Sequence, residues 1–412
     1  MYSNNTYAHR LNSTQGIVMI KRTSLLISSS LALLILTGGA FASQLPKNIE
    51  EMRVSKAEQI LPQVVNRYQA LSDTLDVKLK QSTDELTVTE MTAHQGHRLW
   101  QQAVRDVQSG HSDDRSLYWS RLSMRNILKQ QKPAFKIADW QRDILLKAVE
   151  KSSRGFSDIE FAPESQIKIL LTGFDPFFLD KNIGQSNPSG LAALALDGYR
   201  FEVNGKKVQI ETVMIPVRFR DFDDGIIESL LTPFYRENSL DMVFTISMGR
   251  ENFDIERFPG RNRSAEAPDN LNVLTGASHQ IPIAPQFNGG NSKNGKLNGP
   301  EFVQFSLPVE AMTAVKGHWS ANDNHQVKTL SRGQFNASSL AELQNEISVE
   351  GSGGGYLSNE ISYRSILLRD QFNLHLPVGH IHTPRIKGYD SQVESDIVDQ
   401  IQAMIAAAAS TL

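Results

Sequence analysis

The segment GSGGGYLSN, residues 351–359, places a serine hydroxyl three residues after a run of glycines. Ser358 follows those glycines, and behind it Ile361, Ser365 and Leu368 repeat at the spacing of one helix face. A glycine loop lets the backbone approach a ligand closely, and a helix start behind it presents free N–H groups to an anion. Ser358 is therefore either a helix cap or a nucleophile beside an oxyanion pocket.

A serine nucleophile needs an imidazole to take its proton and a carboxylate to orient that imidazole. His382 in GHIHTPRI and Glu256 in GRENFDIERFPGRNRSAEAPDN can supply these roles. With Ser358 they give the chain order acid, nucleophile, base. The alternative for Glu256 is a solvated cluster with the arginines that surround it in the sequence.

A second chemistry uses histidines as metal ligands. His380 and His382 lie two residues apart, with His375 nearby, and could bind the metal of a hydrolase. Such a pair is a weak signal, since no HExxH motif completes the ligand set. His94 and His97 lie one helical turn apart without carboxylates in register and are typical of a surface pair. We predict neither a metal nor another cofactor.

Two aromatic residues stand in the loop TGFDPFFLDKNIGQSNPSG. Phe174 and Phe177 flank Asp175 and Pro176. Two aromatic rings held by such a turn can sandwich a small flat ring of a ligand. They can equally be core residues, and the pattern alone leaves both interpretations open.

The elements that would position these loops alternate between strand and helix. IKILLTG, VQIETVMI and DMVFTISMG are short apolar runs, and FDDGIIESLLTPFYREN is amphipathic. The alternation predicts an α/β fold with a mostly parallel sheet and helices on both faces. Functional loops of such sheets lie at the carboxyl ends of the strands.

The preceding part, residues 43–152, has the periodicity of helices throughout and is predicted to be an all-α domain of unassigned role. Trp100, Trp119 and Trp140 are expected to fill its core. Residues 153–166 contain the polar, Gly- and Pro-containing sequence expected of a linker. The α/β domain then occupies 167–412.

Residues 1–42 have the pattern of a signal peptide. Lys21 and Arg22 precede the apolar run Leu25–Leu36, and an Ala-x-Ala signal ends at Ala42. The run is short for a membrane span, and the start of translation is Met1 or Met19. We expect an exported protein, periplasmic or secreted, without a stable membrane anchor; an uncleaved anchor is the alternative.

Composition narrows the class of partner. The chain has 412 residues, no cysteine, 21% charged residues and a formal net charge of −3. The absence of a basic surplus argues against nucleic-acid binding. A homo-oligomer is compatible with the sequence.

The four loops together resemble those of pyroglutamyl peptidase I, the pyrrolidone-carboxylate peptidase family of cysteine peptidases. The family's TGFxPF…NPS is matched by residues 172–177 and 187–189, and its GGRxxxxIER…PDN by residues 249–270. Its SxSAGxYLCN is matched by GSGGGYLSN and its FIHVP by HIHTP. The likeness runs from about Ile167 to Leu412, and residues 46–152 lie outside it.

This resemblance implies a three-layer α/β/α sandwich that removes N-terminal pyroglutamate from peptides. The catalytic residues of the family fall on Glu256, Ser358 and His382. Phe174 and Phe177 would hold the lactam ring of the substrate.

Two departures from the family pattern bear on activity. Ser358 stands where the family has its cysteine, and a serine depends on its base during attack, because it is not ionised beforehand. Glu266 replaces an arginine that is thought to hold the substrate oxygen, and Arg261 or Arg263 could compensate. The hypotheses are a Ser/His/Glu hydrolase, an inactive protein that binds pyroglutamyl peptides, and a metal-dependent hydrolase using His380 and His382.

Overall fold

A seven-stranded, mostly parallel sheet organises the C-terminal part of the chain. Its strand order is β2-β3-β1-β4-β12-β5-β8 in a computed structural model that describes residues 45–289 and 292–412. The strands are β1 (Ile167–Phe174), β2 (Arg200–Val203), β3 (Lys206–Ile215), β4 (Met242–Met248), β5 (Phe253–Glu256), β8 (Ala321–Asn324) and β12 (Val378–Thr383). Strands β3, β1, β4 and β12 are parallel to one another, whereas β2 pairs antiparallel with β3 and β5 pairs antiparallel with β12. Strand β8 runs parallel to β5.

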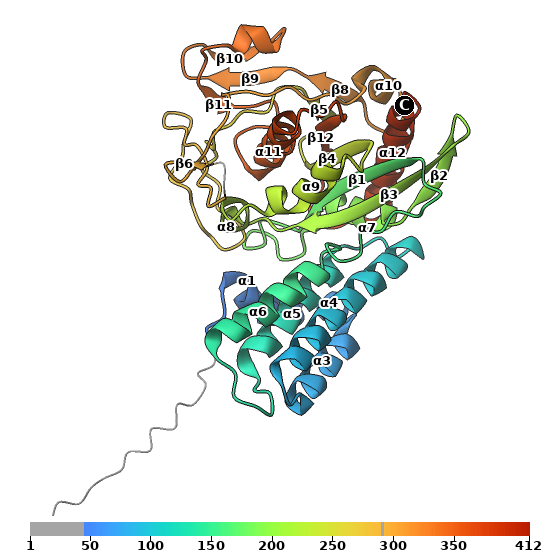
Figure 1. The fold of residues 1–412 in the computed structure, drawn as a ribbon, viewed down its shortest axis with the longest axis vertical. Helices are drawn as coiled ribbons and strands as arrows, with labels where there is room; N and C mark the ends of the chain where they lie inside the picture. The colour runs from blue at the N-terminus through green and yellow to red at the C-terminus, as the bar shows by residue number, and fades with distance from the viewer. Residues whose placement is uncertain (1–44, 290–291) are drawn as a thin grey trace, which may run out of the picture. The chain divides into compact units, whose positions relative to one another are not determined.

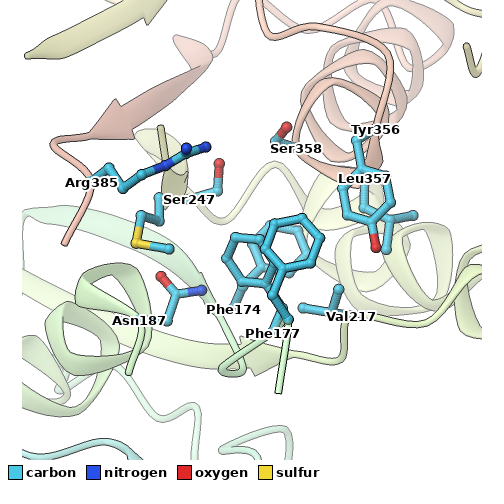
Figure 2. A pocket seen from close by; sticks show the side chains of 11 residues that line it. Phe174, Phe177, Asn187, Val217, Ser247, Tyr356, Leu357, Ser358 and Arg385 are labelled. Atoms are coloured by element: carbon cyan, nitrogen blue, oxygen red, sulfur yellow. The ribbon is translucent and has the colours of Figure 1, made fainter. Parts of the chain in front are cut away.

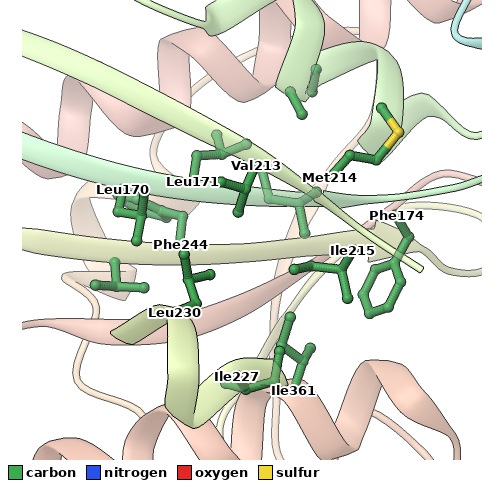
Figure 3. Packing of buried hydrophobic residues seen from close by; sticks show 14 of the residues in the cluster. Leu170, Leu171, Phe174, Val213, Met214, Ile215, Ile227, Leu230, Phe244 and Ile361 are labelled. Carbon is green, nitrogen blue, oxygen red and sulfur yellow. The ribbon is translucent and has the colours of Figure 1, made fainter. Parts of the chain in front are cut away.

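Helices cover both faces of this sheet. Helices α7 (Pro188–Leu196) and α12 (Ser391–Ala409) pack together on one face, and α9 (Ile226–Glu237) and α11 (Leu357–Gln371) on the other (Figure 1). Figure 3 shows buried residues of the sheet, among them Leu170 and Phe244, in one apolar cluster with Ile227 of α9 and Ile361 of α11. Strands covered on both faces are nearly continuous apolar runs, as β1 and β4 are. The predicted three-layer α/β/α fold is confirmed.

Smaller elements surround the sheet. A second sheet has the order β10-β9-β11, and β6 pairs with β7. The bounds are β6 (Ser292–Lys293), β7 (Lys296–Leu297), β9 (Gln326–Thr329), β10 (Gly333–Asn336), β11 (Ser348–Glu350), α8 (Phe219–Asp223), α10 (Val309–Thr313) and the 3₁₀ helix η1 (Leu340–Leu343).

Residues 49–152 are helical, as predicted, and no strand occurs among the described residues of this region. The helices are α1 (Ile49–Ile60), α2 (Pro62–Val65), α3 (Gln69–Gln81), α4 (Glu85–Gln108), α5 (Arg115–Gln130) and α6 (Asp139–Ser152). Trp100 and Trp119 are buried in it, but Trp140 is 61% exposed, so its assignment to the core was wrong. Trp140 is the second residue of α6, on the face turned to solvent.

The helical region and the α/β region share one continuous apolar core within residues 42–412. Residues 153–166 form neither helix nor strand, yet Ser153 and Arg154 are buried. The predicted signal peptide, with Met19 and Ala42, lies outside the described residues, so export stays a prediction. No helix of the described residues is both long and apolar enough to span a membrane.

Candidate active site

The register of two antiparallel strands brings the predicted acid and base together. β12 carries His382 beside β5, with His382 opposite Asp254. Two residues further along β5, Glu256 Oε1 lies 2.5 Å from His382 Nδ1. The carboxylate therefore orients the imidazole and leaves Nε2 for a substrate or nucleophile, as a triad requires.

Glu256 is held from both sides. Its side chain is buried, and its Oε2 accepts a hydrogen bond of 2.8 Å from Asn324 Nδ2. Asn324 stands opposite Glu256 in the parallel pair β5–β8. Burial raises the pKa of the Glu256 carboxyl, and the neighbouring His382 opposes part of that shift. The solvated charge cluster that the sequence left open is therefore wrong for Glu256.

Ser358 lies in the first turn of α11, which begins at Leu357 after the N-cap residue Tyr356. Ser358 is thus not the helix cap. Its hydroxyl is half-buried and donates a 3.2 Å hydrogen bond to the Gly353 carbonyl. The first N–H groups of a helix lack intrahelical acceptors, so the N–H groups of Leu357 and Ser358 can face a developing negative charge.

The glycines before Ser358 permit a close approach between two loops. Gly354 has φ +85°, and a Cβ on Gly355 would lie 2.0 Å from Ser264 Oγ. Asn359 completes the connection, since its amide accepts from the Gly260 N–H at 2.9 Å and donates to the Gly260 carbonyl at 2.7 Å. The loop that follows Glu256 and the glycine segment before Ser358 are thereby held to each other.

A cavity of about 170 Å³ opens in front of Ser358 (Figure 2). Phe174 and Phe177 both line it, and they come from the end of β1 and the loop after it. Its remaining lining residues are Phe178, Asn187, Val217, Ser247, Met248, Tyr356, Leu357 and Arg385. The wall is largely apolar and aromatic, which suits a small flat ligand group.

The two phenylalanines differ in how firmly they are held. Phe174 is 3% exposed and its ring is parallel to that of Phe222, with centroids 6.3 Å apart. Phe177 is half-buried and its ring lies 4.5 Å from that of Phe178. Phe174 is thus both a core residue and part of the cavity wall, so the two interpretations of the sequence were not exclusive.

A second cavity, of about 140 Å³, contains the acid and the base. Glu256, His382 and Gly353 line it, and Met248 and Arg385 line both cavities. Among the described residues no hydrogen bond joins Ser358 to His382, because the serine hydroxyl donates to Gly353. Catalytic hydrogen bonds of this kind often form only when a substrate is bound.

His380 is a buried residue whose two ring nitrogens both have hydrogen-bond partners. It is fully buried, with Nδ1 2.8 Å from Thr245 Oγ1 and Nε2 2.8 Å from Ser247 Oγ. Burial first, and then the adjacent His382, lower its pKa well below the ordinary range, so the ring is neutral. Both nitrogens are occupied, and within the described residues no group of three or more His, Asp or Glu side chains is placed to hold a metal ion.

The charged residues of the loop after Glu256 do not face the two cavities as free charges. Glu266 is exposed and lines neither cavity. Arg263 Nε donates to Glu360 Oε2 at 2.6 Å, and Arg261 pairs with Glu301. Both arginines are thus held in ion pairs, so the compensation for Glu266 that the sequence left open has no support from their positions.

Sequence reasoning missed Arg385, the cation that lines both cavities. It also missed how the helical region holds the loop of the two phenylalanines. Arg121 Nη1 lies 2.9 Å from Asp175 Oδ1, and Arg154 Nη2 lies 2.7 Å from Asp175 Oδ2, with all three side chains buried. No pattern in the sequence indicated these pairings.

Models of known protein families match both the helical part and the α/β part of the chain. A model described as the PA0049 N-terminal domain matches residues 36–150. A model described as the PA0049 C-terminal domain matches residues 168–344 and 320–387. The chain belongs to the PA0049 family. A curated relative, "Uncharacterized protein PA0049" of Pseudomonas aeruginosa, is 30% identical over 387 residues, covering 73% of this chain and 70% of the relative.

Solved structures of pyrrolidone carboxyl peptidase from Pyrococcus furiosus are also similar. A structure of a point mutant of this peptidase has 21% identity and a TM-score of 0.41, covering 60% of this chain and 100% of that chain. A structure of the same peptidase and its cysteine-free mutant has 20% identity and a TM-score of 0.39, covering 60% and 99%.

Proposed function

We propose that this protein removes N-terminal pyroglutamate from peptides with a Ser/His/Glu site. The observation that carries the proposal is the buried Glu256–His382 pair beside an aromatic cavity that contains Ser358. The resemblance of the four loops to pyroglutamyl peptidase I supplies the substrate. The lactam ring would lie against Phe174 and Phe177.

Each residue has one task in the proposed reaction. His382 Nε2 takes the proton of Ser358 as Oγ attacks the carbonyl that joins pyroglutamate to the next residue. Glu256 stabilises the imidazolium, and the N–H groups at the start of α11 stabilise the oxyanion. The C–N bond breaks, the leaving amine takes the proton from His382, and water then releases pyroglutamate and restores the serine.

Ser358 must first turn from Gly353 to His382. A side-chain rotation about χ1 exchanges one staggered position for another, and the 3.2 Å bond to Gly353 that it gives up is a long one. The proposal therefore requires the bound substrate to favour the second position.

A second candidate function is binding without hydrolysis. The hydroxyl of Ser358 bonds to a carbonyl and not to the base, which favours this alternative. The same aromatic cavity would then hold a pyroglutamyl peptide whose amide bond stays intact. Metal-dependent hydrolysis is not proposed, since both nitrogens of His380 are occupied.

The test is release of a fluorophore from a pyroglutamyl amide by the full chain and its Ser358→Ala and Ser358→Cys variants. We expect the wild type to be active and the alanine variant to lose at least about a thousandfold in kcat/KM, as loss of a nucleophile does. Activity in the cysteine variant alone would favour the binding function. Equal activity of wild type and Ser358→Ala would exclude Ser358 as the nucleophile.

A further inference from the structure

Two arginines stand at the cavity of the acid and base without a partner among the described residues. Arg250 follows β4 and Arg385 follows β12, and the Arg385 N–H donates to the Arg250 carbonyl at 2.6 Å. This bond continues the parallel pairing of β4 and β12 beyond the sheet, so both side chains leave the same edge. Both line the cavity of Glu256 and His382.

Neither guanidinium is neutralised by a neighbour. Over residues 45–289 and 292–412 no hydrogen bond or ion pair reaches either side chain, whereas Arg257, Arg261 and Arg263 are each paired with a carboxylate. Asp254 lines the same cavity and its Oδ1 accepts from Asn322 Nδ2 at 2.9 Å, but no ion pair joins its carboxylate to either arginine in the described part of the chain. Within these described ranges, the rim therefore carries two free cations.

Arg385 lies where the two cavities meet. It lines the aromatic cavity of Ser358 and also the cavity of His382. Figure 2 shows its guanidinium beside Ser247, pointing in the direction of Ser358. With the ring of a substrate in the aromatic cavity, the group on the other side of the scissile bond must leave toward the cavity with the arginines.

We propose that Arg385, together with Arg250, binds a carboxylate on the residue that follows pyroglutamate. This inference rests on the proposed function and names its substrate class: pyroglutamyl compounds with a negative charge one residue beyond the ring. The carboxylate is either the free C-terminus of a pyroglutamyl dipeptide or the side chain of an acidic residue. A guanidinium offers paired donors that match a carboxylate, and both arginines are exposed at the rim, so binding is reversible and sensitive to salt.

Calorimetry on Ser358→Ala measures this preference without depending on catalysis. The probes are pyroglutamyl-alanine, its C-terminal amide, and pyroglutamyl-aspartic acid with an amidated C-terminus. We expect one of the charged probes to bind roughly tenfold more tightly than pyroglutamyl-alanine amide, the order expected for a hydrogen-bonded charged group. The charged probe that binds more tightly than the amide identifies the source of the carboxylate.

Introducing Arg385→Gln into the Ser358→Ala variant should remove most of the preference for the charged probe. The affinity for pyroglutamyl-alanine amide should stay within about twofold of that of Ser358→Ala alone. Arg236→Gln, an exposed arginine on α9, is the matched control and should leave the preference unchanged. Equal affinity for all three probes would overturn the inference while leaving the proposed function intact. Failure of every probe to bind would overturn the ring cavity, and the proposed function with it.

Discussion

At the scale of single residues, the proposed site combines a buried carboxyl, Glu256, with an imidazole, His382, whose second nitrogen has no partner among the described residues. Glu256 has 1% exposure and two hydrogen-bond partners, so its orientation is fixed before a substrate binds. The buried, neutral His380 next to His382 adds no positive charge that would oppose a proton on the base. Of the two histidines, only His382 is therefore suited to transfer a proton.

Replacing Glu256 by glutamine should therefore affect the chemical step. The amide keeps the shape but removes the charge that stabilises the imidazolium, and it can present its NH₂ to Nδ1 and so favour the wrong tautomer. We expect kcat on a pyroglutamyl amide to fall by about 10²–10⁴ with KM little changed, by analogy with other triads. Glu251→Gln, exposed and outside both cavities, is the control. A raised KM at unchanged kcat would contradict the role.

The sequence predicted those site residues that stand in a recognisable motif and missed those whose place depends on the path of the chain. Glu256, Ser358 and His382 each stand in a segment with a recognisable sequence pattern, and the rule that functional residues of a mostly parallel sheet gather at the carboxyl ends of its strands predicts that such segments lie close together. Arg385 had no such signal, because its place depends on the path of the chain after β12. The partners of His380 depend on the β4–β12 register, which pairs it with Thr245.

At the scale of elements, the loop after β1 is held by helices that are remote in sequence. Asp175 lies between Arg121 of α5 and Arg154, which follows α6. Arg53 of α1 reaches Asp180 Oδ1 at 2.7 Å in the same loop. The helical periodicity of residues 43–152 was visible in the sequence, but an ion pair between such distant positions leaves no periodic trace. The structure thus gives the helical region a role in holding the phenylalanine loop.

We expect Asp175→Asn to be costly for this reason. Removing one partner of a buried ion pair leaves the other charge uncompensated. Here two arginines, with 1% and 2% exposure, would lose the carboxylate that they share. The free energy of unfolding in urea should fall by about 3–5 kcal/mol. Arg200→Gln, in an exposed pair with Glu164, should change it by less than about 1 kcal/mol. Similar values for the two variants would show that the helices do not hold the loop through Asp175.

At the scale of the whole molecule, a second buried contact joins the two regions beside the site. Asp114, directly before α5, accepts the Asn187 N–H at 3.1 Å, and Glu394 of α12 accepts the hydroxyl of Ser186. Burial raises the pKa of Glu394 to about 8, with the charge of Asp113 adding to it and that of Arg115 opposing it. Burial and the charge of Glu394 raise the pKa of Asp114 well above its usual range.

These raised pKa values predict how stability changes with pH. A carboxyl with a higher pKa in the folded state stabilises that state while it is protonated in both states, below an unfolded pKa of about 4.3. The contribution is lost as the pH rises toward the folded value of about 8 for Glu394. The wild type should therefore lose a few kcal/mol of unfolding free energy between about pH 5 and pH 8, since one pKa unit corresponds to about 1.4 kcal/mol.

Glu394→Gln should flatten that decline, because the amide stays neutral at every pH and can still accept from Ser186. Urea unfolding at about pH 5, 6.5 and 8 measures the effect, and Asp399→Asn on the exposed face of the same helix is the control. The variant should be more stable than the wild type at the highest of these pH values and close to it at the lowest. If wild type and Glu394→Gln decline in parallel, the Glu394 carboxyl is ionised in the folded protein over this pH range, and its burial does not cause the decline.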